Sequence, residues 1–287
     1  MERAPALELP ASVVATMDVA LALQGVAAVL VVVPSQTVRE NARLLAPHLA
    51  KGTPVLHATK GLESRSGRRV SEMLLEEVPE LARRAICALS GPNLAPEIQR
   101  GLPAATVIAG HDAAVVDALQ RLVHTTVFRV YASSDLVGVE LAGSLKNVIA
   151  IAAGIADGLA MGDNAKAGII TRGLAEMTRV AVAAGASPNT FLGLAGVGDV
   201  MATCYSRLSR NRTLGEAIGR GRSVEEALAA STGVVEGVEA TTAACMLAER
   251  YGIEMPIARG LREILVEGAR PQAVIARLLE REPKREG

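Results

Sequence analysis

The pattern of apolar and polar positions divides the chain into two parts. In the first part, short apolar runs alternate with stretches of helical periodicity, which is typical of a parallel sheet with crossover helices. The run Ala27–Val33 is continuously apolar and ends at Pro34, so we expect a strand buried on both faces, followed by a helix capped by Ser35. Further strands are predicted at residues 54–58, 85–89, 105–109 and 127–131, and helices at 35–48, 69–77 and 112–123.

From about Asp135 the period becomes helical and stays so to the end of the chain. Residues 136–159 are predicted to form a long buried helix with a break near Gly154. Ser223 and Glu226 have the spacing of a capping box, and Pro256 suits the first position of a helix. The remaining helices are predicted at residues 164–185, 224–230, 235–251, 256–268 and 270–282. The predicted fold is therefore α/β: an incomplete Rossmann-type parallel sheet domain in residues 1–135, followed by an all-helical domain in residues 136–287.

Composition excludes several function classes. The formal net charge is zero, whereas a general nucleic-acid binder needs a basic surface. The longest apolar run, residues 26–33, is shorter than the ~20 residues that span a bilayer, and no secretory signal pattern opens the chain. Neither the three cysteines nor the four histidines have metal-ligand spacing. We therefore expect a cytoplasmic protein with buried free cysteines, no membrane span, no metal and no nucleic-acid partner.

Lysine is scarce, and two of the five lysines lie at unusual places. Lys146 interrupts an apolar helical segment, and Lys60 follows a predicted strand, at the sheet edge where α/β proteins bind ligands. Each could be an ordinary surface lysine whose stem covers apolar neighbours. Alternatively, Lys146 is partly desolvated, has a lowered pKa and transfers a proton.

The segment from Gly193 to Asn211 is a third candidate. Closely spaced glycines precede Asp199, and Ser209-Arg210-Asn211 can begin a helix whose free N–H groups and guanidinium favour an anion. The alternative is an ordinary capped helix with a solvated arginine. Taken together, a proton-transferring lysine, a lysine at the ligand edge of a sheet and an anion site suit the reduction of a small phosphorylated ketone.

Seven ordered motifs resemble the bacterial NAD(P)-dependent glycerol-3-phosphate dehydrogenases over essentially the whole chain. The motifs are Val33-Pro34-Ser35-Gln36, Ala58-Thr59-Lys60-Gly61-Leu62-Glu63, Ser90-Gly91-Pro92, the segment from Gly138 to Gly154, Gly193-Leu194-Ala195-Gly196-Val197-Gly198-Asp199, Ser209-Arg210-Asn211-Arg212 and Val235-Glu236-Gly237-Val238. The resemblance implies interconversion of dihydroxyacetone phosphate and sn-glycerol 3-phosphate with NAD or NADP, supplying phospholipid synthesis. By analogy we also expect a homodimer through the helical domain.

The resemblance also assigns roles to individual residues. Lys146 is implied as the proton donor and acceptor. The implied substrate contacts are Lys60, Gly91, Asn93, Lys146, Asp199, Ser209, Arg210 and Asn211. The implied cofactor contacts are Lys60, Ala95, Arg210, Val234 and Glu236.

The sequence departs from the family pattern in two ways. Asn93 stands where Ser or Thr is usual, and Leu94 where Phe is usual. More importantly, nothing matches the N-terminal strand and glycine-rich loop that cradle the cofactor pyrophosphate. Gly196-Val197-Gly198 is not that loop, because no strand precedes it. We expect at least one βαβ unit to be missing, and weak or no dinucleotide binding by the polypeptide as printed.

Two alternatives follow from these departures. One is a truncated, non-catalytic relative that does not bind dinucleotide and acts as a subunit or binding module. The other is a related hydroxyacid or ketopantoate-type reductase, which would share the two-domain plan and the lysine but would not need the Ser209-Arg210-Asn211 anion site.

Overall fold

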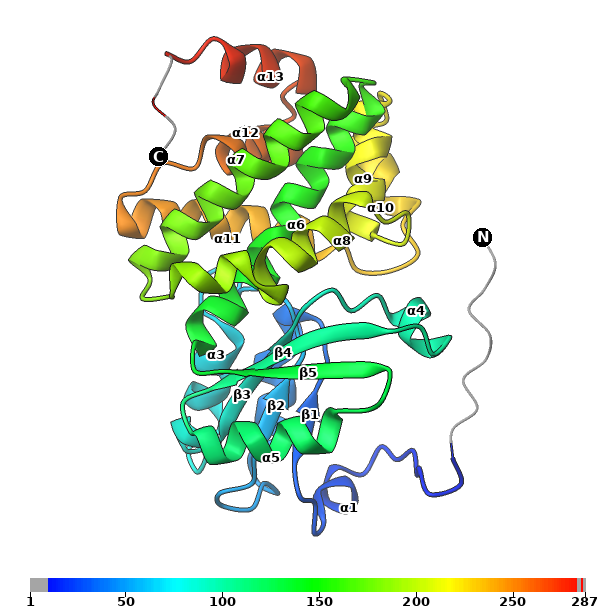
Figure 1. The fold of residues 1–287 in the computed structure, drawn as a ribbon, viewed down its shortest axis with the longest axis vertical. Helices are drawn as coiled ribbons and strands as arrows, with labels where there is room; N and C mark the ends of the chain where they lie inside the picture. The colour runs from blue at the N-terminus through cyan, green and yellow to red at the C-terminus, as the bar shows by residue number, and fades with distance from the viewer. Residues whose placement is uncertain (1–9, 283–284, 286–287) are drawn as a thin grey trace.

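A sheet of five strands is followed by a bundle of helices in a computed structural model that describes residues 10–282 and 285 (Figure 1). The strands lie side by side in chain order, as β1 (Val29–Val31), β2 (Val55–His57), β3 (Ile86–Ser90), β4 (Ala104–Gly110) and β5 (Phe128–Ser133). All neighbouring pairs are parallel except β3 and β4, which are antiparallel. The prediction of a fully parallel sheet is wrong at this point. Only the short α4 (Ala95–Gln99) lies between β3 and β4, and the chain turns back without a full crossover.

Helices cover the two faces of the sheet unequally. α2 (Val38–Leu45) and α3 (Val70–Glu77) pack on the face that carries Val55 and Ile86. On the opposite face, Leu56 and Cys87 pack with α5 (Ala113–Val123). Alternate residues of a strand point to opposite faces, so β2 and β3 contribute to both cores.

The expected double burial of the first strand is not observed. β1 lies at the edge of the sheet, and Leu30 is 60% exposed. α5 contacts β4 and β5 rather than β1, so no described helix covers the face of β1 that carries Leu30. The short α1 (Val19–Leu23) precedes β1. The capping role predicted for Ser35 is also wrong, because this buried residue begins a 3-10 turn at Ser35–Thr37 and α2 starts only at Val38, without a side-chain cap.

α6 (Leu136–Gly158) is the central helix of the second part and runs from the sheet into the bundle (Figure 1). It is long and apolar enough to cross a membrane, but 89% of its most apolar window is buried inside the protein, as expected of a core helix. The predicted break near Gly154 is absent. Instead, α9 (Arg210–Gly219) passes so closely that a Cβ at residue 154 would lie 2.1 Å from the Arg212 carbonyl oxygen.

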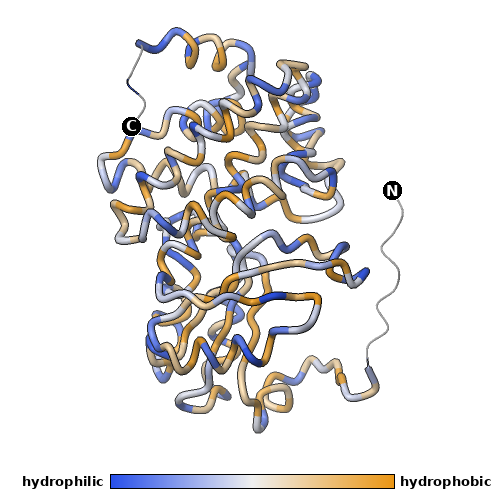
Figure 2. Tube along the Cα trace, in the orientation of Figure 1, coloured by the Kyte–Doolittle hydropathy of each residue, from blue (hydrophilic) through white to orange (hydrophobic). Residues whose placement is uncertain are grey.

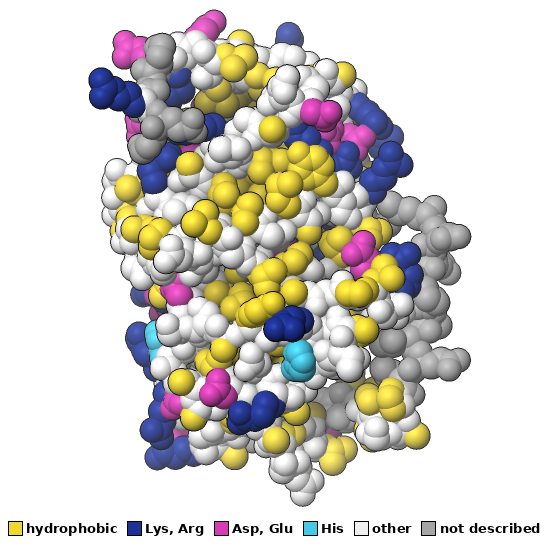
Figure 3. Space-filling view, in the orientation of Figure 1, with side chains coloured by type: hydrophobic (Ala, Val, Ile, Leu, Met, Phe, Trp, Pro, Cys, Tyr) yellow, Lys and Arg dark blue, Asp and Glu magenta, His cyan; other side chains and the backbone are white. Residues whose placement is uncertain are grey.

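The other helices surround α6. They are α7 (Gly162–Ala183), α8 (Asp199–Tyr205), α10 (Val224–Ala229), α11 (Glu236–Tyr251), α12 (Pro256–Val266) and α13 (Pro271–Leu279). The predicted capping box between Ser223 and Glu226 and the helix start at Pro256 are confirmed. Apolar and polar residues alternate along these helices (Figure 2), and on the face seen in Figure 3 hydrophobic side chains lie over the middle of the bundle with charged ones toward its edges. The three cysteines are free and buried, as predicted.

Candidate active site

Lys146 lies in the middle of α6, and its amine is held inside the protein. Nζ donates hydrogen bonds to Asp199 Oδ1 at 2.5 Å and to Thr203 Oγ1 at 2.8 Å. Asp199 and Thr203 are four residues apart on α8, so both face α6. With Lys146 only 7% exposed, the alternative of a snorkelling surface lysine is excluded.

Lys60 reaches the same carboxylate from the other part of the chain. It follows β2, and its Nζ donates to Asp199 Oδ2 at 2.7 Å and to the Gly91 carbonyl oxygen at 2.9 Å. Asp199 is 2% exposed and therefore bridges two ammonium groups within the protein. The structure brings together Lys60, Gly91, Lys146 and Asp199, as the sequence led us to expect.

The charges of this cluster perturb one another. Burial lowers the pKa of Lys146 to about 8, helped by the nearby ammonium of Lys60 and opposed by Asp199. Burial by itself would raise the pKa of Asp199, but Lys60 and Lys146 outweigh it and hold that pKa below its ordinary value. An amine with a pKa near 8 is mostly protonated at neutral pH and still loses its proton readily, which suits a general acid and base.

The predicted helix start at Ser209 is confirmed as the N-terminus of α9. Ser209 is the N-cap, and its Oγ accepts from the Arg212 amide at 3.2 Å. Asn211 donates to Asn147 Oδ1 at 3.0 Å, one residue from Lys146, and accepts from the Gly237 amide at 2.9 Å. Thus the start of α9, where free N–H groups favour an anion, is joined to α6 beside Lys146.

Glu236 lies at the start of α11 and also belongs to this region. Burial raises the pKa of its carboxyl group, against the opposing influence of Arg210, the Ser35 amide and, more weakly, Lys146 and Lys60. Arg210 itself is exposed, and a Cβ at Gly233 would lie 2.5 Å from its Nη1. Glu236 is therefore coupled electrostatically to Arg210 and to the two lysines.

Three described residues that were predicted to contact substrate or cofactor form no hydrogen bond or ion pair with the Lys60–Asp199–Lys146 cluster. Asn93 Oδ1 accepts from Thr106 Oγ1 at 2.9 Å, so its side chain is engaged with β4. Ala95 is exposed at the start of α4, and Val234 is 53% exposed in the loop before α11. Their assignment to substrate or cofactor stays a prediction.

Sequence reasoning missed Thr203 and gave Asn147 no specific role. Thr203 hydrogen-bonds the Lys146 amine, and Asn147 holds Asn211. The spacing of Asp199 and Thr203 by four residues could have indicated a shared helix face once α8 was recognised.

Three of the predicted cofactor contacts lie in this region. Lys60, Arg210 and Glu236 carry charged groups, and the pKa of Glu236 responds to the other two. Polar groups of this kind suit the nicotinamide ribose of a dinucleotide. Along residues 10–282 no Gly-x-Gly turn follows a strand, and Gly196-Val197-Gly198 lies at a kink before α8, where the backbone of Gly196 is not helical. Within the described residues, the structure therefore offers no Gly-x-Gly candidate for a pyrophosphate site. The same residues contain no cluster of three His, Cys, Asp or Glu side chains that could hold a metal.

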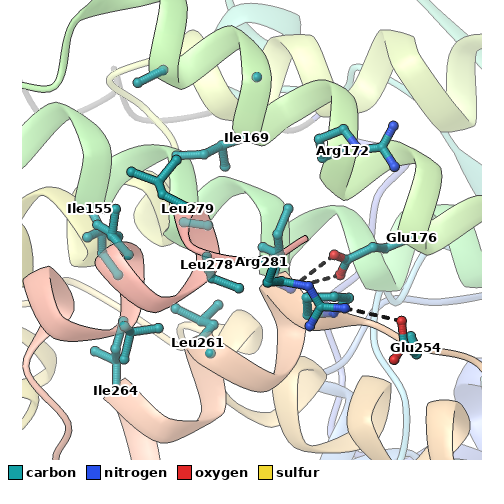
Figure 4. A pocket seen from close by; sticks show the side chains of 18 of the residues that line it. Ile155, Ile169, Arg172, Glu176, Glu254, Leu261, Ile264, Leu278, Leu279 and Arg281 are labelled. Carbon is teal, nitrogen blue, oxygen red and sulfur yellow. Dashed lines mark hydrogen bonds and ion pairs between the residues drawn. The ribbon is translucent and has the colours of Figure 1, made fainter. Parts of the chain in front are cut away.

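The helical part contains a separate cavity of about 820 Å³ between α6, α7, α12 and α13 (Figure 4). Its walls are mainly aliphatic, and Arg281 pairs with Glu254 at its edge. Glu176 accepts hydrogen bonds there from the Ile257 amide at the start of α12. None of the predicted site residues lines this cavity, so its size does not make it the active site.

Comparison with known families and proteins covers both parts of the chain. Residues 2–116 match the family described as NAD-dependent glycerol-3-phosphate dehydrogenase N-terminus, and residues 135–276 match the corresponding C-terminus. The glycerol-3-phosphate dehydrogenase [NAD(P)+] of Chlorobium phaeobacteroides strain BS1 is 44% identical over 98% of this chain and 84% of its own length. The corresponding Streptomyces griseus protein is 45% identical with the same coverage.

Comparison with solved structures gives the same family. The glycerol-3-phosphate dehydrogenase of Coxiella burnetii superposes with a TM-score of 0.91 and 38% identity, over 96% of this chain and 84% of that one. A putative ketopantoate reductase from Ralstonia solanacearum reaches a TM-score of 0.52 at 14% identity, which is a likeness of fold alone. This chain belongs to the NAD-dependent glycerol-3-phosphate dehydrogenase family.

Proposed function

We propose that the chain interconverts dihydroxyacetone phosphate and sn-glycerol 3-phosphate with NAD(P)(H), with Lys146 as proton donor and acceptor. The observation that carries this assignment is the buried Lys60–Asp199–Lys146 bridge beside the N-terminus of α9. This bridge places an amine suited to proton transfer beside a helix start suited to a phosphate. A hydroxyacid or ketopantoate-type reductase is disfavoured, since its substrate carries no phosphate.

The chemistry assigned to the chain's own residues is proton transfer and positioning. A bound reduced nicotinamide supplies the hydride. Lys146 donates its proton to the carbonyl oxygen and takes it back from the alcohol in the reverse direction. Its charge also stabilises the developing alkoxide, an effect of roughly 3 kcal/mol in a preorganised site. Asp199 and Thr203 hold the amine in place.

The phosphate is assigned to the start of α9. Arg210 contributes a planar guanidinium, and Ser209 and Asn211 frame the turn. Lys60 contacts both Asp199 and the Gly91 loop, and we assign it to both substrate and nicotinamide. Gly91 and Asn93 are assigned to substrate, and Ala95, Arg210, Val234 and Glu236 to cofactor. A homodimer, a cytoplasmic location and a role in phospholipid supply stay predictions.

The test is oxidation of NADH or NADPH by dihydroxyacetone phosphate, compared with ketopantoate as a carboxylated ketone. Lys146→Met keeps the volume of the side chain and should lower kcat by about 10²-fold or more, corresponding to roughly 3 kcal/mol. Lys166→Met is the matched control, because Lys166 is equally buried but pairs with Asp157 on a different part of α6. Preference for ketopantoate, or full activity of Lys146→Met, would contradict the assignment. If the wild-type chain bound glycerol 3-phosphate without turnover, the non-catalytic alternative would be favoured.

A further inference from the structure

Glu140 is a buried carboxylate on the first part of α6, and four groups converge on it. Oε2 accepts from Arg69 Nη1 at 2.5 Å and from Ser71 Oγ at 2.7 Å. Oε1 accepts from the Ser71 amide at 2.8 Å and lies 3.2 Å from His57 Nε2. The side chains of Glu140 and His57 are both 2% exposed, so solvent does not share these contacts.

These partners belong to elements that carry the active site. His57 is the last residue of β2, three residues before Lys60, and Arg69 and Ser71 lie at the start of α3. Glu140 itself is six residues before Lys146, about 9 Å along the helix at 1.5 Å per residue. The Glu140 network (Glu140, His57, Arg69 and Ser71) therefore fastens the Lys146 helix to the start of α3 by hydrogen bonds, and it places Glu140 against His57 at the end of β2.

The face of α6 that carries Glu140 approaches Lys60 directly. Glu140, Gly143 and Asn147 have the spacing of one helix face. A Cβ at Gly143 would lie 2.6 Å from Ser90 Oγ and 3.6 Å from Lys60 Cγ. With so little space between α6 and Lys60, a small rotation or slide of the helix would change the distance from Lys146 to Asp199.

Hydrogen bonds to a buried carboxylate are directional in a way that aliphatic packing is not. Three donors from α3 fix both oxygens of Glu140, which restricts rotation of α6 about its axis as well as translation along it. Burial by itself would raise the pKa of the Glu140 carboxyl group, but His57, Arg69 and the Ser71 amide outweigh it and lower the pKa to about 2. The carboxylate is thus charged throughout the range in which the enzyme would work.

We infer that Glu140 is a positioning residue that sets the place of Lys146 relative to Lys60 and Asp199 by fastening α6 to the start of α3, beside the end of β2. This inference rests on the proposed function for its catalytic consequence. Its geometric consequence, the buried position of the Lys146 amine against Asp199, can be measured without turnover. Glu140 does not touch the reacting atoms.

The experiment compares Glu140→Ala with a matched control, Glu176→Ala. Glu176 is equally buried and also binds the start of a helix, α12, but it lies away from the lysine cluster. Two readouts are taken: kcat and KM for dihydroxyacetone phosphate, and the rate at which trinitrobenzenesulfonate modifies Lys146 relative to Lys166 without substrate or cofactor. Lys166 is as buried as Lys146 and serves as the internal reference, and mass spectrometry resolves the two sites.

Displacement of reacting groups by about 1 Å can cost about 10²-fold, so Glu140→Ala should lower kcat by up to this factor with little change in KM. The modification ratio of Lys146 to Lys166 should rise in Glu140→Ala and not in Glu176→Ala. If Glu140→Ala fails to fold, Ser71→Ala, which removes one hydrogen bond from the α3 side, should show smaller changes in the same direction.

An unchanged kcat and modification ratio in a folded Glu140 or Ser71 variant would overturn the inference, as would equal changes in Glu176→Ala. An inactive wild-type chain whose modification ratio still responds to Glu140→Ala would sink the proposed function and leave the positioning role standing. If the wild type is active but Glu140→Ala changes neither kcat nor the modification ratio, the proposed function stands and the positioning role of Glu140 is refuted.

Discussion

Replacing Asp199 by Asn removes the single charge that compensates two ammonium groups. Asn keeps the shape of the side chain, so the packing of α8 should persist. Lys60 can turn toward solvent, since its side chain is 19% exposed, whereas the Lys146 side chain at 8% cannot easily do so. Breaking a buried ion pair by removing one partner typically costs 3–5 kcal/mol. We expect the free energy of unfolding at pH 7 to fall by about this amount.

The pH dependence follows from the same contacts. In the wild type the pKa of Lys146 is lowered to about 8 from an ordinary value of 10.5, and Asp199 is one of the groups that keep it from falling further. Without that carboxylate the Lys146 pKa should fall below 8. A base whose folded pKa is lowered binds fewer protons folded than unfolded, so stability rises with pH above the folded pKa. In Asp199→Asn the free energy of unfolding should therefore begin to rise with pH already below pH 8. The Lys146 contribution to this free energy in the wild type is constant over the same pH range.

Urea unfolding followed by circular dichroism between pH 6 and pH 9 measures both effects. The double variant Asp199→Asn/Lys146→Met removes the buried charge together with its partner and should recover most of the loss. A variant Asp199→Asn that is as stable as the wild type at pH 7 would refute the reasoning. A double variant no more stable than Asp199→Asn would show that the uncompensated Lys146 charge is not the cause.

Three further predictions concern separate features. Because the pKa of Lys146 is about 8, kcat for ketone reduction should fall as the pH rises through 8 while kcat for alcohol oxidation rises, and pH profiles in both directions should show mirrored limbs unless another group carries the proton. Gly154→Ala places a Cβ 2.1 Å from a backbone oxygen of α9 and should destabilise by more than about 2 kcal/mol. Gly168→Ala, in α7 with nothing within 4 Å, should instead stabilise by up to about 1 kcal/mol, and equal melting temperatures would contradict this comparison. The pKa of Glu140 is lowered from 4.5 to about 2, so its stabilisation of about 3 kcal/mol is complete above pH 4.5 and is lost as the pH falls toward 2. In Glu140→Ala the free energy of unfolding should therefore change less steeply with pH between 4.5 and 2 than in the wild type.

Local patterns in the sequence were enough for the elements and for several functional residues. Alternation of apolar runs and helical periods predicted the five strands and most of the helices, because both signals depend on neighbours a few residues apart. The caps at Ser209 and Ser223 were predictable for the same reason. Lys146 could be predicted as a candidate site residue because an ammonium in an apolar helix must be desolvated, paired or functional.

Pairing across long sequence separations was not predictable in this way. Lys60 and Asp199 are 139 residues apart, and nothing local to either indicates that one carboxylate serves two lysines. The antiparallel pairing of β3 with β4 and the exposure of Leu30 on an edge strand depend on which elements become neighbours. The close approach of α9, which leaves no room for a Cβ at Gly154, is likewise a tertiary feature.

The sequence by itself determined the order of elements, the family and the residue types available for proton transfer and anion binding. The tertiary structure decided which charges meet in the interior, and therefore the lowered pKa of Lys146 and the fastening of its helix by Glu140. The physical reason is that propensities and caps act over a few residues. Desolvation and charge pairing, in contrast, depend on distances of a few ångströms between groups that the chain brings together only on folding.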